Sequence, residues 1–147
     1  MHLINRLLLV IIPTIIASAM TGNAQIKPGE WNAQSPGANI SIVLYENGVA
    51  AISYSSRNAD VEAKGRWKTM TEGKYAGCAR LDLTIEYVNT NGTPHGEGAT
   101  AAPIYIQQVG NQAFIVNSTN IGGIEINISL KLRHTGYRHK APPVGNG

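Results

Sequence analysis

The chain has 147 residues, of which 12 are basic and 9 are acidic, so its formal net charge is +3. After removal of the leader described below, this length allows a single domain. The lone cysteine, Cys78, excludes a disulfide within the chain, so the fold must be stabilised by packing. We expect Cys78 to be either a small buried apolar residue or one half of a disulfide between two chains.

Residues 1–24 have the pattern of a cleaved signal peptide. A basic start containing Arg6 precedes an apolar run at 7–16, and small residues then suit cleavage before Met20 or Gln25. The apolar run is shorter than the roughly 20 residues that span a bilayer. We therefore expect a secreted or periplasmic protein.

Alternation of apolar and polar residues is the strongest structural signal in the mature chain. Side chains of a strand point to opposite faces with a period of two, so half-buried strands alternate. Three segments alternate in this way: 61–68, 81–87 and 124–133. No helical pattern of ten residues occurs in the mature chain, which indicates an all-β protein.

Turn residues predict two hairpins. Glu46-Asn47-Gly48 separates apolar runs at 40–45 and 49–54, and Asn-Gly favours a type I′ turn. Gly110-Asn111 separates similar runs at 102–109 and 112–117.

A short opening strand at 30–33 brings the expected count to seven or eight strands. Such spacing favours a small antiparallel β-barrel or a sandwich over residues 25–135. The ten-residue run at 124–133 would span ~33 Å if flat, so we expect it to bend or to wrap around a barrel. Residues 136–147 are expected to form a disordered basic tail rich in Pro and Gly.

Short motifs resemble those of the calycins, the lipocalin-like class of antiparallel β-barrels. Gly29-Glu30-Trp31 is similar to the Gly-x-Trp that opens the first strand of that class. Residues 40–48, followed by Gly65-Arg66-Trp67-Lys68, resemble short bacterial lipocalin-like domains. The resemblance implies an up-and-down barrel with a central cavity open at one end. Because this domain is shorter than full lipocalins and lacks their disulfides, the alternative is a closed barrel filled by side chains. It also implies that Arg133 packs over Trp31.

Aromatic residues on the expected strands are the candidate ligand-binding residues: Trp31, Tyr54, Trp67, Tyr87 and Tyr105. If they face a cavity, they can orient a small apolar ligand in it. The alternative is that they are ordinary core or half-buried strand aromatics.

A Gly-rich loop at 89–101 is the candidate partner-binding segment, with His95 and Glu97 near its centre. A histidine and a carboxylate can share acid–base work or a metal ion. In a glycine-rich loop these two are not preorganised, so we expect neither a metal site nor a catalytic residue here. The spacing of His134 and His139 fits no structural zinc pattern.

Other chemistry-bearing motifs are missing from the sequence. It contains no nucleophile elbow, no phosphate-binding glycine loop and no basic, aromatic strand face for nucleic acid. We therefore expect no cofactor and no nucleic-acid partner. Four basic residues lie in the last 17, so the tail is expected either to contact anionic surfaces weakly or to remain solvated.

These features predict a non-enzymatic binding module that holds a small apolar molecule in a barrel cavity. The alternative is an inhibitor or immunity protein that blocks an exported enzyme through a loop or strand edge. An enzyme with a cavity lined by Tyr and His is the third hypothesis. An apolar pocket of ~300 Å³ or more would favour the first, whereas a filled barrel with an exposed patch would favour the second.

Overall fold

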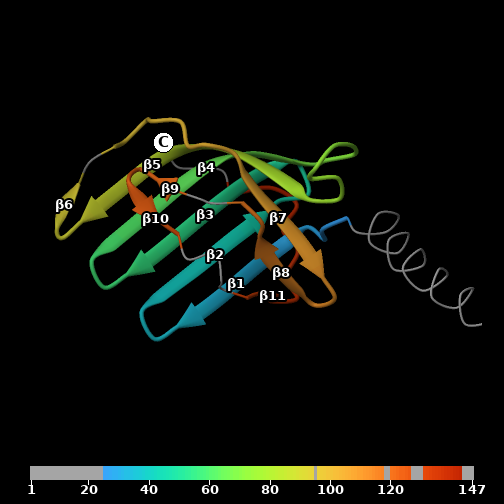
Figure 1. Cartoon of the computed structure of the whole chain (residues 1–147), viewed down its shortest axis with the longest axis horizontal. Coiled ribbons are helices and arrows are strands. Elements are labelled where there is room, and N and C mark those ends of the chain that lie inside the picture. Colours follow the sequence, from blue (N-terminus) through green and yellow to red (C-terminus); the bar gives the residue numbers. More distant parts are fainter. Residues whose placement is uncertain (1–24, 95, 118–119, 127–130, 144–147) are drawn as a thin grey trace, which may run out of the picture.

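Figure 1 shows the computed structural model of the chain, in which every regular element among the described residues is a β-strand. These are residues 25–94, 96–117, 120–126 and 131–143. The signal peptide expected at 1–24 and the candidate residue His95 lie outside them. Within the described part, no helix is long and apolar enough to cross a membrane.

Eight antiparallel strands close into a barrel within the described residues: β1 (Gly29–Ser35), β2 (Ala38–Leu44), β3 (Val49–Ser56), β4 (Ala59–Thr69), β5 (Ala79–Thr90), β7 (Ile104–Val109), β8 (Gln112–Ile115) and β11 (Leu132–His134). Each strand pairs with the next, and β11 returns to pair with β1. The short β6 (Thr93–Pro94) extends the sheet beside β5, and β9 (Asn120–Ile121) pairs only with β10 (Ile124–Glu125). The all-β prediction is confirmed, and the fold is a barrel.

Both predicted hairpins form, but the first has a different turn. In the β2–β3 turn only Gly48 has a positive φ, +90°, and its N–H donates to the carbonyl of Tyr45 over 3.0 Å. This is a type I turn followed by a glycine bulge, so the type I′ prediction is wrong. The β7–β8 turn has two residues and a positive φ at Gly110 alone, as a type II′ turn requires.

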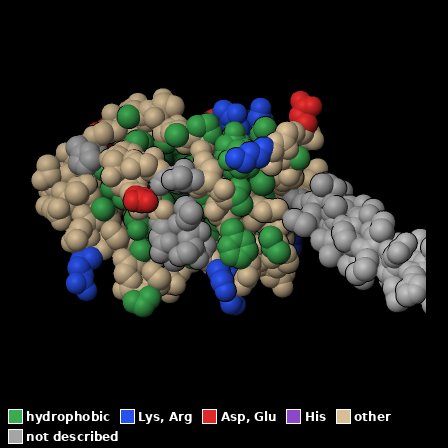
Figure 2. All heavy atoms as spheres, in the orientation of Figure 1, with side chains coloured by type: hydrophobic (Ala, Val, Ile, Leu, Met, Phe, Trp, Pro, Cys, Tyr) green, Lys and Arg blue, Asp and Glu red, His purple; other side chains and the backbone are tan. Residues whose placement is uncertain are grey.

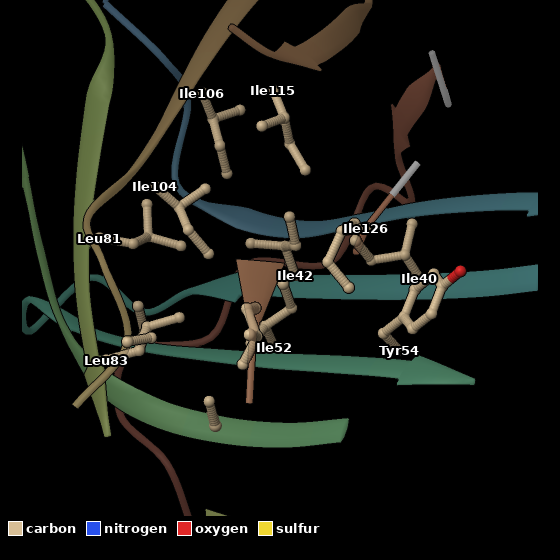
Figure 3. Packing of buried hydrophobic residues seen from close by; sticks show 14 of the residues in the cluster. Ile40, Ile42, Ile52, Tyr54, Leu81, Leu83, Ile104, Ile106, Ile115 and Ile126 are labelled. Atoms are coloured by element: carbon tan, nitrogen blue, oxygen red, sulfur yellow. The ribbon is translucent and has the colours of Figure 1, made fainter. Parts of the chain in front are cut away.

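Apolar side chains from all around the barrel fill its interior (Figure 3). The inward positions of β2, β3, β5, β7 and β8 converge, and their buried residues include Ile42, Ile52, Leu81, Leu83, Ile104, Ile106 and Ile115. Each such side chain contributes roughly 1.5–3 kcal/mol when fully buried. The predicted alternation is therefore the physical basis of the core.

A β-bulge in β5 changes which residues face the core. Glu62 pairs with Tyr87 and Ala63 with Ile85, so Glu86 is an extra residue. Val88 then points inward and is fully buried, whereas Tyr87 lies half-buried on the outer face. A strict period of two at 81–87 had placed Tyr87 on the inner face with Leu81, and the bulge reverses this.

The expected strand at 124–133 is divided between two sheets. Ile124 pairs with Ile121 in the small hairpin, whereas Leu132 pairs with Ala113 in the barrel. A Gly122-Gly123 turn between β9 and β10, with φ of +61° and +88°, accounts for the difference. Residues 127–130 lie outside the described part.

The β9–β10 hairpin and the residue after it cover one end of the barrel. Ile121, Ile124 and Ile126 are buried, and Figure 3 places Ile126 beside Ile40 and Tyr54. A side chain at Gly122 would come within 2.7 Å of Val88, so this turn lies directly on β5. We call residues 120–126 the plug.

Residues 135–140, which we call the strap, lie at the opposite end of the barrel against β1 and the β2–β3 turn. Its Thr135 N–H donates to the carbonyl of Glu30 (2.9 Å), and its Tyr137 carbonyl accepts the N–H of Glu30 (3.2 Å). Farther along, the carbonyls of His139 and Lys140 accept backbone N–H groups of the β2–β3 turn at 2.9 Å each. The start of the tail expected to be disordered is thus hydrogen-bonded to the barrel.

Candidate binding surfaces

The five candidate aromatic residues lie on two sides of the barrel wall. Trp31, Tyr54 and Trp67 belong to the inner face. Tyr87 and Tyr105 lie on the outer face. The structure therefore does not bring the five together into one site.

Trp31 fills the strap end of the barrel. It is 1% exposed, and its indole N–H donates to the carbonyl of Lys27 over 3.0 Å. His134, its register partner on β11, packs edge-on against it, with ring centroids 4.9 Å apart. The expectation that Arg133 packs over Trp31 is wrong: Arg133 pairs with Asn32 and is exposed, because alternate residues of β11 face opposite sides.

Trp67, on β4, lies at the same end of the barrel, and its surroundings are similar. Its indole N–H donates to the carbonyl of Tyr45 over 2.8 Å. A Cβ on Gly65, two residues earlier, would overlap the carbonyl oxygen of Asp82, and one on Gly29 would overlap the His134 ring. In both Gly-x-Trp motifs, glycine allows a close approach and tryptophan fills the space beside it.

Recesses open to solvent on the outer face of β1 to β3 and beside the start of β1, and none of these is lined by the inward-facing aromatics. Tyr54 is 7% exposed, and Figure 3 shows its hydroxyl directed away from the centre of the cluster. Trp31 and Tyr54 belong to the buried core, and Trp67 packs against it.

The outer face carries a group of aromatic and cationic side chains that we call the aromatic patch: Tyr75, Tyr105, Lys74 and Arg80. The rings of Tyr75 and Tyr105 stack with centroids 3.9 Å apart and planes 15° from parallel. The Arg80 guanidinium lies 5.9 Å from the Tyr105 centroid, and the Lys74 ammonium lies 5.4 Å from that of Tyr75. Figure 2 shows hydrophobic side chains over β7 and β8, with Lys and Arg side chains nearby.

Local contacts hold this patch in place. The side chain of Asn117 accepts the N–H of Tyr105 (2.9 Å) and donates to the carbonyl of Pro103 (2.9 Å), which fixes the start of β7. Asp82 binds the Arg80 guanidinium at 3.1 Å and, by this hydrogen bond and its charge, raises the pKa of Arg80 further above its ordinary value. The stacked rings and Arg80 are thus held by contacts on the outer face of the barrel.

The Gly-rich loop at 89–101 pairs in part with a strand of the barrel. Its residues 98–101 pair with β5: Ile85 exchanges backbone hydrogen bonds with Gly98 (2.7 Å) and Ala99 (2.8 Å). The loop therefore covers the β5 edge that a partner strand would otherwise use. Glu97 is exposed on this loop.

The sequence carried little signal for the aromatic patch. Tyr105 belonged to an expected strand, but Tyr75 lies in the β4–β5 connection, where no alternating pattern shows its neighbours. Among the described residues, no three His, Cys, Asp or Glu side chains gather closely enough to hold a metal ion. Comparison with protein-family models, curated proteins and solved structures finds no match to this chain.

Proposed function

We propose that this protein is an exported, non-enzymatic binding module that recognises another exported protein through the aromatic patch. The observation that carries the proposal is the stacked pair of Tyr75 and Tyr105, which lies on the outer face beside Arg80 while the described interior is packed with apolar side chains. Tyr and Arg are enriched at the energetic centres of protein interfaces. Rigid, stacked rings lose little conformational freedom on binding.

The charges beside the patch favour an acidic partner surface. Lys68 is the register partner of Arg80, and Lys74 lies over the neighbouring tyrosine. The acids nearby are Asp82, which already binds Arg80, and Glu72, which lies with Lys74 in the β4–β5 connection. Such an excess of positive charge steers encounter with an acidic face and makes the association rate depend on salt.

We also place the domain in the lipocalin-like class as part of this proposal. Support comes from the closed antiparallel barrel and from the Gly-x-Trp motif, whose Trp31 fills one end beside the last strand. Export rests on the pattern of residues 1–24.

The test is capture of the partner by the purified mature protein from exported proteins of its own host, using site-directed photo-crosslinking at the patch. One acidic protein should be retained by the wild type and lost with Tyr105→Ala. Ser41→Ala, on the outer face of β2, is the matched control and should retain it.

With the purified partner, Tyr105→Ala should weaken affinity by about tenfold or more, as expected for a central aromatic residue. Raising the salt concentration should slow association. Equal affinity of Tyr105→Ala and Ser41→Ala for every captured protein would contradict the proposal.

A second function is favoured by the plug. It closes its end of the barrel chiefly with Ile121, Ile124 and Ile126, and among the described residues β9 and β10 pair at two positions. A small apolar molecule that displaced these side chains would find an interior of matching polarity. Native mass spectrometry of the protein from its host should then show a non-covalent mass addition that is lost on denaturation. Repeated absence of that addition would argue against this function.

A further inference from the structure

A recess beside the start of β1 has not been used by either function. Its volume is about 630 Å³, and its lining includes Lys27, Val109, Asn111, Gln112, Arg133 and His134. These residues come from the segment before β1, the β7–β8 turn and β11. We call it the basic recess; it shares no residue with the aromatic patch.

Hydrogen bonds between side chains and backbone fix two walls of the basic recess. The Gln108 amide accepts the N–H of Lys27 and donates to the carbonyl of Gly110, both at 2.8 Å. On the other side, His134 Nδ1 accepts the N–H of Gly136 at 3.0 Å, so its Nε2–H donates to the carbonyl of Pro28 at 2.9 Å. Walls tied in this way need little rearrangement to receive a ligand.

The residues that line the basic recess suit an anion. Lys27 and Arg133 are exposed cations, and neither charged head group has an ion pair or hydrogen bond within the described part of the chain. Gln112 is the register partner of Arg133, which places an amide beside the guanidinium. No carboxylate lines the recess.

The nearest carboxylate on β1 is already engaged. Glu30 lies 3.8 Å from His139 in the strap and accepts a long hydrogen bond of 3.4 Å from Asn32. Glu30 does not line the basic recess, and neither Lys27 nor Arg133 is paired with it in the described part of the chain.

We infer that the basic recess binds a small organic oxyanion, a carboxylate or phosphate carried on a compact apolar body. The planar fork of Arg133 matches two oxygens of such a head group, and Lys27 supplies a second positive charge. Val109, which is 56% exposed, offers an apolar surface to the body of the ligand. The volume lies within the roughly 300–1,000 Å³ of small-molecule sites.

Nuclear magnetic resonance titration of the ¹⁵N-labelled mature protein tests this inference with four probes. Benzoate and phenyl phosphate carry the two head groups on one apolar ring, inorganic phosphate lacks the ring, and benzyl alcohol lacks the charge. One of the two ring-bearing anions should give saturable shifts at the side-chain amides of Asn111 and Gln112 and at Arg133 Nε. Benzyl alcohol should give none, and the preferred anion identifies the head group.

Arg133→Ala should lower that affinity by about tenfold or more. The matched control is Arg57→Ala, which removes an exposed arginine from the β3–β4 turn and should leave the affinity unchanged. Because the Arg133 side chain is exposed, we expect the variant to fold. An unaltered spectrum away from the recess will verify this.

Two results would overturn the inference: no saturable shift with either ring-bearing anion, or equal weakening by Arg133→Ala and Arg57→Ala. The inference does not depend on the proposed partner, because Arg133→Ala should leave capture through the aromatic patch intact. Failure of one can therefore be distinguished from failure of the other.

Discussion

His134 packs edge-on against Trp31, with their ring centroids 4.9 Å apart and their planes at 85°. The same imidazole accepts the N–H of Gly136 and donates to the carbonyl of Pro28. One side chain therefore joins the first strand, the last strand and the start of the strap. An arginine one residue earlier cannot do this, because the alternation of β11 directs Arg133 to solvent.

Replacing His134 by alanine should destabilise the fold by about 1–3 kcal/mol, since it opens a gap beside Trp31 and leaves backbone groups without partners. Arg133→Ala is the matched control and should change stability by no more than about 0.5 kcal/mol, because the side chain is exposed. Urea unfolding followed by tryptophan fluorescence measures both. A larger loss of stability in Arg133→Ala than in His134→Ala would contradict this and support the packing of Arg133 over Trp31 that the lipocalin-like resemblance implied.

Gly65→Ala should cost about 2 kcal/mol or more. The new methyl group would overlap the backbone of Asp82 on the paired strand, and backbone moves less readily than a side chain. Gly37→Ala is a control with opposite expectation: nothing lies within 4 Å of its Cβ and its φ is compatible with alanine. It should be neutral or raise stability by about 0.4–1 kcal/mol through the unfolded state. Thermal unfolding of the two variants compares them, and equal losses would show that the close approach at Gly65 does not matter.

Much of the barrel could be predicted from two kinds of local signal. The alternation at 61–68 identified β4, because a strand with one buried face must alternate. Glu46-Asn47-Gly48 and Gly110-Asn111 identified two hairpins, because glycine there adopts a positive φ. The type of the first turn was not predictable from Asn-Gly alone, since the number of loop residues also decides it.

Two local features could not be predicted from a strict period of two residues. The bulge at Glu86 adds one residue to β5 and thereby moves Tyr87 outward and Val88 inward. The sequence alternates at 124–133, but the turn at Gly122-Gly123 brings Ile124 and Glu125 back to pair with β9. That dipeptide between two isoleucines is itself a hairpin signal, and it would have located the plug.

The candidate surfaces were harder to anticipate, because they depend on contacts between distant segments. Tyr75 and Tyr105 meet only after β5 and β7 pair, and Lys27 and Arg133 line one recess only when the barrel closes. Composition shows neither relationship. The sequence supplied the residues, and the register of the strands determined which of them meet.

Cys78 gives a test of the core that depends on pH. The thiol is 4% exposed, and burial raises its pKa above the ordinary value. The folded state thus disfavours the thiolate. The stability that depends on a protonated Cys78 is fully present below the unfolded pKa and is lost as the pH rises through the folded pKa. Urea unfolding from neutral to alkaline pH should show a decline that Cys78→Ala reduces. An identical decline in that variant would mean that other groups cause it.

The strap should stabilise the barrel through its backbone more than through its charges. A chain ending at Gly136 keeps the His134 contact but loses the carbonyls of Tyr137, His139 and Lys140 as hydrogen-bond acceptors. We expect a loss of about 1–3 kcal/mol, because each hydrogen bond contributes roughly 0.5–1.5 kcal/mol and water replaces part of it.

The Arg138–Glu46 ion pair (3.6 Å) and the contact of His139 with Glu30 (3.8 Å) are partly exposed and should add little. A chain ending at Lys140 retains every one of these contacts and should match the full-length mature domain in urea unfolding. Arg138→Ala should also lie within about 0.5 kcal/mol of it. If Arg138→Ala instead lost as much stability as the chain ending at Gly136, charge rather than backbone pairing would hold the strap across the barrel.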